Sequence, residues 1–213
     1  MAAARSSGIA AAEPTANELL HGNDSAAAEL LTLAKVNLPD LNRTSALDAQ
    51  LVWGRWGVFG PGGDQVSVPF SLARLDRHVT VADEDFGLFR TNASGAGHQF
   101  SDLTAGSVDF RLTRASASFT MGAAGEKALI SAGSLSIDFA RRSFATGLDL
   151  STAAGVKGEL RVAGEIRADG IFSVRDADQR VSGAVAHDGR EAGYLFERSA
   201  GGGLFRGITL WGK

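Results

Sequence analysis

The chain has 213 residues, of which 44% are hydrophobic and 21% charged, and its formal net charge is −3. This composition suits a globular protein with one core and excludes wholesale disorder. The weak negative charge and the lack of Lys/Arg runs exclude a nucleic-acid-binding protein, because phosphate recognition needs a concentrated basic surface. Without cysteine, the chain has no disulfide, thiolate metal site or cysteine nucleophile.

The first forty-eight residues differ in composition from the rest. Residues 1–12 have small side chains and no apolar stretch long enough for a signal peptide, so we expect a flexible leader. We expect a short helical segment over residues 13–48. A capping-box spacing predicts one helix at 16–21, and a stripe of leucines predicts a second helix over 26–36. No run of about 18 apolar residues occurs, so no transmembrane segment is predicted.

From about residue 49, apolar and polar side chains alternate. Val108, Phe110 and Leu112, for example, are separated by Asp109 and Arg111. Such alternation predicts strands with one buried and one wet face. The expected strands are 51–59, 66–72, 78–91, 107–121, 128–139, 144–150, 158–167, 171–174, 180–187, 191–198 and 205–211.

Turn signals separate these strands. Asp169-Gly170 and Asp188-Gly189 predict tight type I′ hairpins, and glycine-rich stretches at 122–125 and 201–203 predict looser turns. Many consecutive strands in a meander leave exposed edges unless the sheet closes. The expected fold class is therefore mainly β: a closed antiparallel β-barrel of about eight strands within residues 49–213, preceded by the short helical segment.

Five glycine-containing segments follow one another in the second half of the chain, at 133–139, 144–150, 164–172, 181–184 and 191–196. In this order they resemble the C-terminal β-barrel of transferrin-binding protein B, over roughly residues 107–213. The segment Trp53–Trp56, with the sequence Trp-Gly-Arg-Trp, is also similar to the C-terminal part of some Fec-regulator-type envelope proteins. Both resemblances imply a β-barrel domain.

The resemblance also implies a function. It points to a non-enzymatic binding or interaction module of a bacterial cell-envelope protein, in the periplasm or at the cell surface, with a role in iron or haem uptake or in signalling. The alternative is a structural barrel that assists secretion or stabilises a larger surface protein. A protein partner, contacted by loops at one barrel end, or a small apolar ligand is expected. The cofactor and the oligomeric state stay open.

The histidines offer one candidate ligand site. His21, His78, His98 and His187 are scattered, and none has a metal-ligand spacing, so no metal site is expected. His187 lies next to a predicted turn, seven residues before Tyr194. Such a pair can hold a haem iron at a barrel mouth, although a histidine beside a turn is more often solvated.

Two further features have a structural and a functional interpretation. The acidic run 83–85 offers oxygen ligands for calcium, but a solvated loop is the commoner use of such a run. Trp53, Trp56 and Trp211 fall in the first and last predicted strands, where they either fill the barrel or stack on a ligand. No nucleophile elbow, phosphate loop or zinc-helix motif occurs, so no catalytic residue is predicted.

Overall fold

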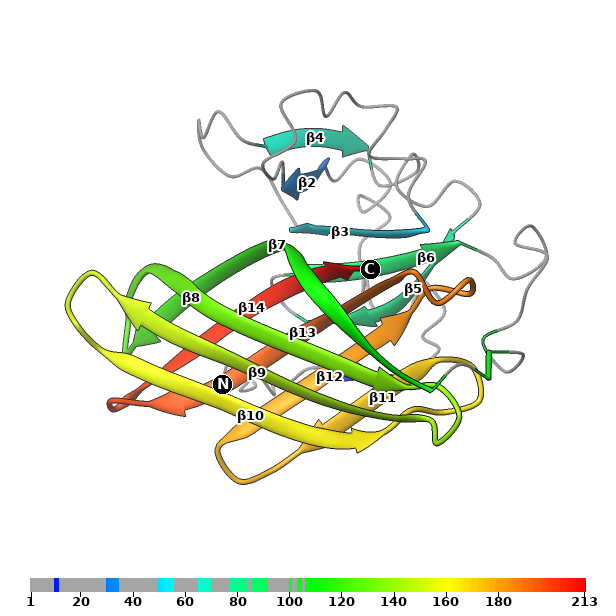
Figure 1. Ribbon diagram of the computed structural model, residues 1–213. Coiled ribbons are helices and arrows are strands. Elements are labelled where there is room, and N and C mark those ends of the chain that lie inside the picture. Colours follow the sequence, from blue (N-terminus) through cyan, green and yellow to red (C-terminus); the bar gives the residue numbers. More distant parts are fainter. Residues whose placement is uncertain are drawn as a thin grey trace, which may run out of the picture.

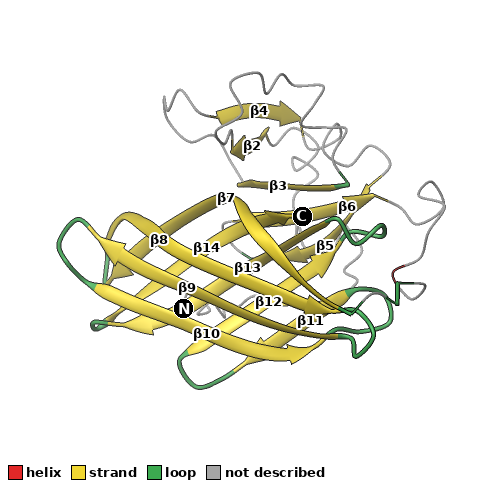
Figure 2. Cartoon of the chain, in the orientation of Figure 1, coloured by secondary structure: helices red, strands yellow, loops and turns green. Residues whose placement is uncertain are grey.

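The structure, a computed structural model, describes residues 10–11, 30–34, 50–55, 65–69, 77–83, 86–91, 100, 103–104 and 106–213. Strands supply almost all of their regular structure (Figure 2). Six strands form a side sheet with the order β1-β5-β6-β3-β2-β4, and eight form a barrel sheet with the order β10-β9-β8-β7-β14-β13-β12-β11 (Figure 1).

The side-sheet strands are β1 (Ala10–Ala11), β2 (Leu30–Ala34), β3 (Leu51–Arg55), β4 (Gln65–Pro69), β5 (Arg77–Ala82) and β6 (Phe86–Thr91). The barrel strands are β7 (Ser107–Met121), β8 (Ala124–Asp138), β9 (Ser143–Thr152), β10 (Lys157–Glu165), β11 (Ile171–Arg175), β12 (Gln179–Val185), β13 (Glu191–Ala200) and β14 (Gly203–Gly212). Each barrel strand from β7 to β13, except β10, pairs with its successor in the chain, and β14 returns to pair with β7. The predicted mainly-β, eight-stranded antiparallel barrel is thus confirmed, in a nearly closed form.

The barrel stays open along one seam, between β10 and β11. A single bridge joins Ile166 to Phe172 at the top of this seam. Farther along, the side chain of Gln179 takes the place of a strand: its Oε1 accepts the Arg161 N–H at 3.3 Å, and its Nε2 donates to the Arg161 carbonyl at 2.9 Å. Outside these contacts, no ladder pairing joins β10 to β11.

The barrel interior is a packed apolar core, because every second residue of each strand points inward. The rings of Phe144 and Phe172 pack in a tilted arrangement at a centroid distance of 4.4 Å, and those of Phe119 and Phe205 at 4.6 Å. The other large buried side chains of this core are Phe100, Phe110, Leu135, Ile137, Phe139, Leu148, Leu150, Leu160, Val162, Ile166, Val181, Val185, Tyr194, Phe196 and Trp211.

The outer wall is apolar on one half only, where the side sheet covers it. Ile171, Leu195 and Ile208 point outward from the barrel and join Trp53 and Leu88 of the side sheet in a second buried cluster. Polar contacts fix the same interface. The Arg90 guanidinium of β6 donates to the Asp169 carbonyl at 2.7 Å and to the Val185 carbonyl at 3.0 Å.

The expected N-terminal helix over 26–36 is wrong where the structure can test it. Residues 30–34 form strand β2, which pairs with β4 from Leu30↔Pro69 to Ala34↔Gln65. Leucines at 30, 31 and 33 fit a strand as well as a helix, and pairing with β4 outweighs the weak local helix preference. The helix expected at 16–21 lies outside the described residues.

The single strand expected over 78–91 is divided. Asp83 interrupts it, because its Oδ1 accepts the Phe86 N–H at 2.6 Å and closes a turn between β5 and β6. A polar residue inside an apolar run can end a strand by bonding to its own backbone in this way.

The type I′ turns expected at Asp169-Gly170 and Asp188-Gly189 are also wrong in type. Of each pair only the glycine has positive φ, 81° at Gly170 and 67° at Gly189. Each glycine N–H bonds to the carbonyl three residues earlier, which indicates a type I turn followed by a left-handed glycine. The aspartate carboxylates accept the N–H two residues on, so they stabilise this turn.

Gly183 on β12 is the tightest glycine of the core. A Cβ there would lie 2.3 Å from the Gly193 carbonyl oxygen and 2.5 Å from both the Phe172 ring and the Tyr194 Cβ. We expect Gly183→Ala to lower the free energy of unfolding by about 3 kcal/mol, because backbone atoms cannot yield. Urea denaturation measures this loss. Gly106→Ala is the matched control, since a Cβ at Gly106 meets nothing within 4 Å; equal stabilities of the two variants would contradict the packing.

Candidate functional site

Tyr194, one of the two predicted haem ligands, lies inside the barrel. Its hydroxyl is 2.7 Å from the Thr146 Oγ1, which itself donates to the Ser134 carbonyl at 2.8 Å. Tyr194 therefore donates to Thr146. Complete burial raises the pKa of the Tyr194 hydroxyl, so the phenolate that iron prefers is disfavoured.

Trp211 fills the space beside this tyrosine. The two rings stack at a centroid distance of 5.8 Å, and the Trp211 Nε1–H donates to the Thr209 Oγ1 at 2.7 Å. Thr209 in turn donates to the Tyr194 carbonyl at 3.3 Å. Two short hydrogen-bonded chains thus satisfy the polar atoms of the two largest interior side chains.

His187, the other predicted haem ligand, lies at the interface with the side sheet. Its Nε2 is 3.0 Å from the Thr91 carbonyl oxygen, so this nitrogen carries the proton and donates. Burial, followed by the positive charge of Arg90, lowers the pKa of the His187 imidazole. The residue is 5% exposed, so it is buried beneath the end of β6.

The structure therefore gives His187 and Tyr194 separate roles. His187 bonds to the backbone of the side sheet, and Tyr194 belongs to the hydrogen-bonded chain inside the barrel. Neither residue lines the two surface hollows described below. Binding of one iron by both would require the Tyr194–Thr146 and His187–Thr91 contacts to break.

The remaining sequence candidates are dispersed. Within the described part of the chain, no group of three His, Asp or Glu side chains could hold a metal ion. Asp83 closes the β5–β6 turn, while residues 84 and 85 of the acidic run are not described. Trp53 packs edge-on against Phe86 at 6.0 Å beneath the side sheet. Trp56, His21 and His98 lie outside the described residues.

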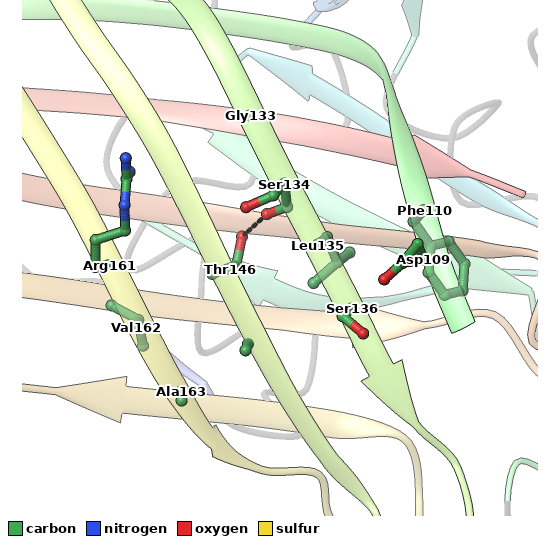
Figure 3. A pocket seen from close by; sticks show the side chains of 11 residues that line it. Asp109, Phe110, Gly133, Ser134, Leu135, Ser136, Thr146, Arg161, Val162 and Ala163 are labelled. Atoms are coloured by element: carbon green, nitrogen blue, oxygen red, sulfur yellow. Dashed lines mark hydrogen bonds between the residues drawn. The ribbon is translucent and has the colours of Figure 1, made fainter. Parts of the chain in front are cut away.

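One hollow lies on the outer surface of the barrel, across β7, β8, β9 and β10 (Figure 3). Its volume is about 580 Å³. The floor is made of small side chains on neighbouring strands: Ser134 and Ser136 of β8, Ala145 of β9 and Ala163 of β10. We call this feature the wall hollow.

Two opposite charges lie at the two ends of the wall hollow, Asp109 on β7 and Arg161 on β10 (Figure 3). The Arg161 guanidinium is held in place: it donates to the Leu148 carbonyl at 3.1 Å, the Leu160 carbonyl at 2.8 Å and the Asp149 carboxylate at 2.7 Å. The bond to Asp149 raises the pKa of Arg161. Arg161 thus supplies a rigid edge to the hollow.

A second hollow of about 600 Å³ lies at one barrel end, between the β7–β8 and β13–β14 turns. Gly122 and Gly202, both with positive φ, contribute to its lining. Met121 stands next to it and is 54% exposed, and Leu129 on the same hairpin is 55% exposed. Among the described residues, these two are the large hydrophobic side chains that are exposed to solvent. We call the hollow between the two turns the end hollow.

Sequence reasoning missed the wall hollow. Its floor consists of Ser and Ala at positions 134, 136, 145 and 163, which sequence alternation identifies only as solvent-facing. The small residues on the outer face of three adjacent strands are a sequence signal for such a hollow. The pairings Ser136↔Ala145 and Ala145↔Ala163 that bring these residues together require the register of the sheet.

Comparison with known proteins gives similarity at the level of the fold. No protein-family model matches the chain, and no curated protein matches its sequence. Among solved structures, intact Ap-TbpB (N and C lobes) is similar with a TM-score of 0.41 and 11% identity, over 85% of this chain and 35% of that chain. Isotype 1 transferrin binding protein B from serogroup B Neisseria meningitidis has a TM-score of 0.40 and 12% identity, over 87% and 43%.

The chain thus spans about a third of the first of these proteins and less than half of the second. Transferrin-binding protein B is also the family that the sequence resembles. Within the described residues, no helix has the length and hydropathy that crossing a bilayer requires.

Haem titration tests the paired-ligand hypothesis. We expect the Soret band of haem to stay unshifted on mixing with the wild-type chain, because both side chains are committed to other contacts. Absorption spectroscopy with wild type, His187→Ala and Tyr194→Ala measures this directly. A saturable shift that weakens in both variants would reverse this expectation.

His187 also predicts a pH dependence of stability. Because its pKa is lowered in the folded chain, the unfolded chain binds more protons as the pH falls below about 6.5, and stability is lost in that direction. We expect His187→Gln, which keeps an N–H donor, to lose less stability than wild type between pH 7.5 and 5.5. Urea denaturation at both pH values measures the difference, and identical losses would contradict this role.

Proposed function

We propose that the chain is a non-enzymatic binding module of a bacterial cell-envelope protein, and that the wall hollow receives a protein partner. The observation that carries the proposal is the contrast between the two halves of the barrel wall. Part of the outer face of β11–β14 is apolar and is covered by the side sheet. The outer face of β7–β10 carries the polar wall hollow, which none of the described residues covers.

Because side chains fill the barrel interior, a ligand or partner is expected to bind at the outer surface. Tyr194 and Trp211 fill the barrel, and their polar atoms are bonded to other groups of the chain. A carrier of a small apolar ligand needs an enclosed cavity lined by apolar side chains. The wall hollow is open, and it combines serine hydroxyls with one carboxylate and a held guanidinium.

The chemistry of the wall hollow favours a protruding side chain of a folded partner. Small floor residues leave room for a ring or an aliphatic chain from outside, and the exposed carboxylate of Asp109 suits a neighbouring basic group. Arg161 already bonds to two backbone carbonyls and to Asp149. It therefore shapes the edge of the wall hollow and does not offer a free positive charge to a partner.

The location in the cell envelope, and the role in iron or haem uptake or in signalling, are proposed from the sequence resemblance. The second candidate is a structural barrel that assists secretion or stabilises a larger surface protein. The end hollow with Met121 is the alternative recognition surface, because exposed large hydrophobic residues commonly mark interaction sites.

Photo-crosslinking separates these possibilities. A photoreactive amino acid is placed at Ala145 in the wall hollow, at Met121 beside the end hollow, or at Ser173 on β11 as the control. Each protein is then illuminated with envelope extract of the source bacterium. We expect a discrete crosslinked protein from position 145 and none from position 173.

Filling the hollow provides the matched test. Ala163→Arg in the same chain places a long side chain over the floor, and we expect it to abolish the crosslink from position 145 while the melting temperature stays close to wild type. A crosslink from position 121 alone would move recognition to the end hollow. Absence of a discrete product at both positions would favour the structural barrel and overturn the binding proposal.

A further inference from the structure

The open seam leaves one edge of β10 without a partner strand. β10 pairs with β9 along its whole length, from Lys157↔Ser151 to Glu165↔Ser143, but no ladder joins its other edge to β11. In Figure 1 the two strands diverge along the lower side of the barrel. An unpaired strand edge offers a row of N–H and C=O groups to another strand.

The direction of these groups follows from the Gln179 contacts. Successive residues of a strand direct their backbone N–H and C=O groups alternately to one neighbour and then to the other. The N–H and C=O of Arg161 both bond to Gln179, so they face the seam. Residues 157, 159, 163 and 165 therefore also face the seam, and the even-numbered residues face β9.

The residues that face the seam carry alternating charges. Lys157, Glu159, Arg161 and Glu165 are exposed and point outward, with Ala163 between the last two. When two copies of this strand pair antiparallel, only registers that set one odd-numbered residue opposite another can form the backbone bonds. The charges then discriminate among these registers, because like charges directly opposite are unfavourable.

Of the registers that bring opposite charges together and set no like charges opposite each other, the one about Leu160 pairs the most residues of β10. A two-fold axis at Leu160 sets Glu159 opposite Arg161 of the second copy, and the symmetry repeats this attractive contact. An axis at Arg161 would set two arginines opposite each other, and an axis at Glu159 would set two glutamates opposite each other. Axes at Gly158 and Ala163 also bring opposite charges together, Lys157 with Glu159 and Arg161 with Glu165. They pair fewer residues of β10 than the axis at Leu160 does, so the Leu160 register is favoured.

We propose that two copies of the chain associate through their β10 strands, antiparallel about a two-fold axis at Leu160, to form a continuous sheet across the seam. Lys157 and Ala163 would extend the pairing on either side, for about eight backbone hydrogen bonds in total. The backbone of Glu159 from the second copy would replace Gln179 at Arg161. Such a contact is small, so the dimer exchanges with monomer.

Charge exchange between copies is the decisive experiment. Glu159→Arg alone sets two arginine pairs across the axis, and Arg161→Glu alone sets two glutamate pairs. An equimolar mixture of the two variants restores two opposite-charge contacts. Sedimentation velocity over micromolar to millimolar concentrations measures the association of wild type, each variant and the mixture.

We expect wild type to dimerise, each single variant to dissociate about tenfold more readily, and the mixture to recover the wild-type association. Glu126→Arg, which makes the same charge change on β8, should associate like wild type. Thermal melting of every variant establishes that the barrel is folded. Within its own chain Arg161 pairs with Asp149 at 2.7 Å and with Glu159 at 3.0 Å, and both single variants disturb these contacts. Recovery in the mixture therefore separates the contact between copies from any loss within one chain.

Ala163→Pro is an independent probe of the backbone pairing. It removes an N–H that faces the seam while leaving the bonds to β9 intact, so it should weaken the dimer. The proposal is overturned if wild type stays monomeric at every concentration, or if the mixture associates no better than the single variants. In either case the charges of β10 protect the edge against pairing.

Discussion

The apolar outer face of β11–β14 is the constraint on which the rest of the molecule depends. Part of each of these strands is buried on both faces; Phe172 and Tyr194, for example, point into the barrel while Ile171 and Leu195 point out of it. A sheet with two apolar faces needs a second layer. The side sheet supplies that layer, and by doing so it determines which half of the wall stays available to other molecules.

Close approach at glycines is the second requirement of the fold. The chain contains 27 glycines, and several of them face aromatic rings instead of lying in turns. A Cβ at Gly133 would meet the Trp211 ring at 2.9 Å, and one at Gly207 would meet the Phe196 ring at 2.8 Å. The aromatic side chains fill the interior because the opposing strands carry no side chain at these points.

Much of the barrel could be predicted from the sequence, because alternation along its strands is strict. The expected segment 107–121 coincides with β7, and the expected segments 171–174 and 191–198 fall within β11 and β13. The leucine run at 30–33 gave a wrong helix, since three leucines in four residues fit both periods and only pairing with β4 decides. At Asp169 and Asp188 the turn type follows from local bonds, because each carboxylate accepts the N–H two residues on.

The candidate site was not predictable, for a different reason. The wall hollow exists because positions 136, 145 and 163 are neighbours across three strands, and this depends on register, which local patterns do not determine. The seam likewise depends on where β11 leaves β10. Gln179 carries no sequence signal for its role, yet its amide imitates a strand residue at Arg161.

The polar contacts between the two sheets explain why their arrangement is fixed. The apolar cluster between them is non-directional and would tolerate sliding. Arg90 bonds to the Asp169 and Val185 carbonyls, His187 to the Thr91 carbonyl, and Glu191 accepts the Leu51 N–H at 3.1 Å. Because buried polar groups lose hydrogen bonds when displaced, these contacts specify one position of the side sheet. The apolar cluster therefore provides the attraction, and the polar contacts at the ends of β3 and β6 provide the register.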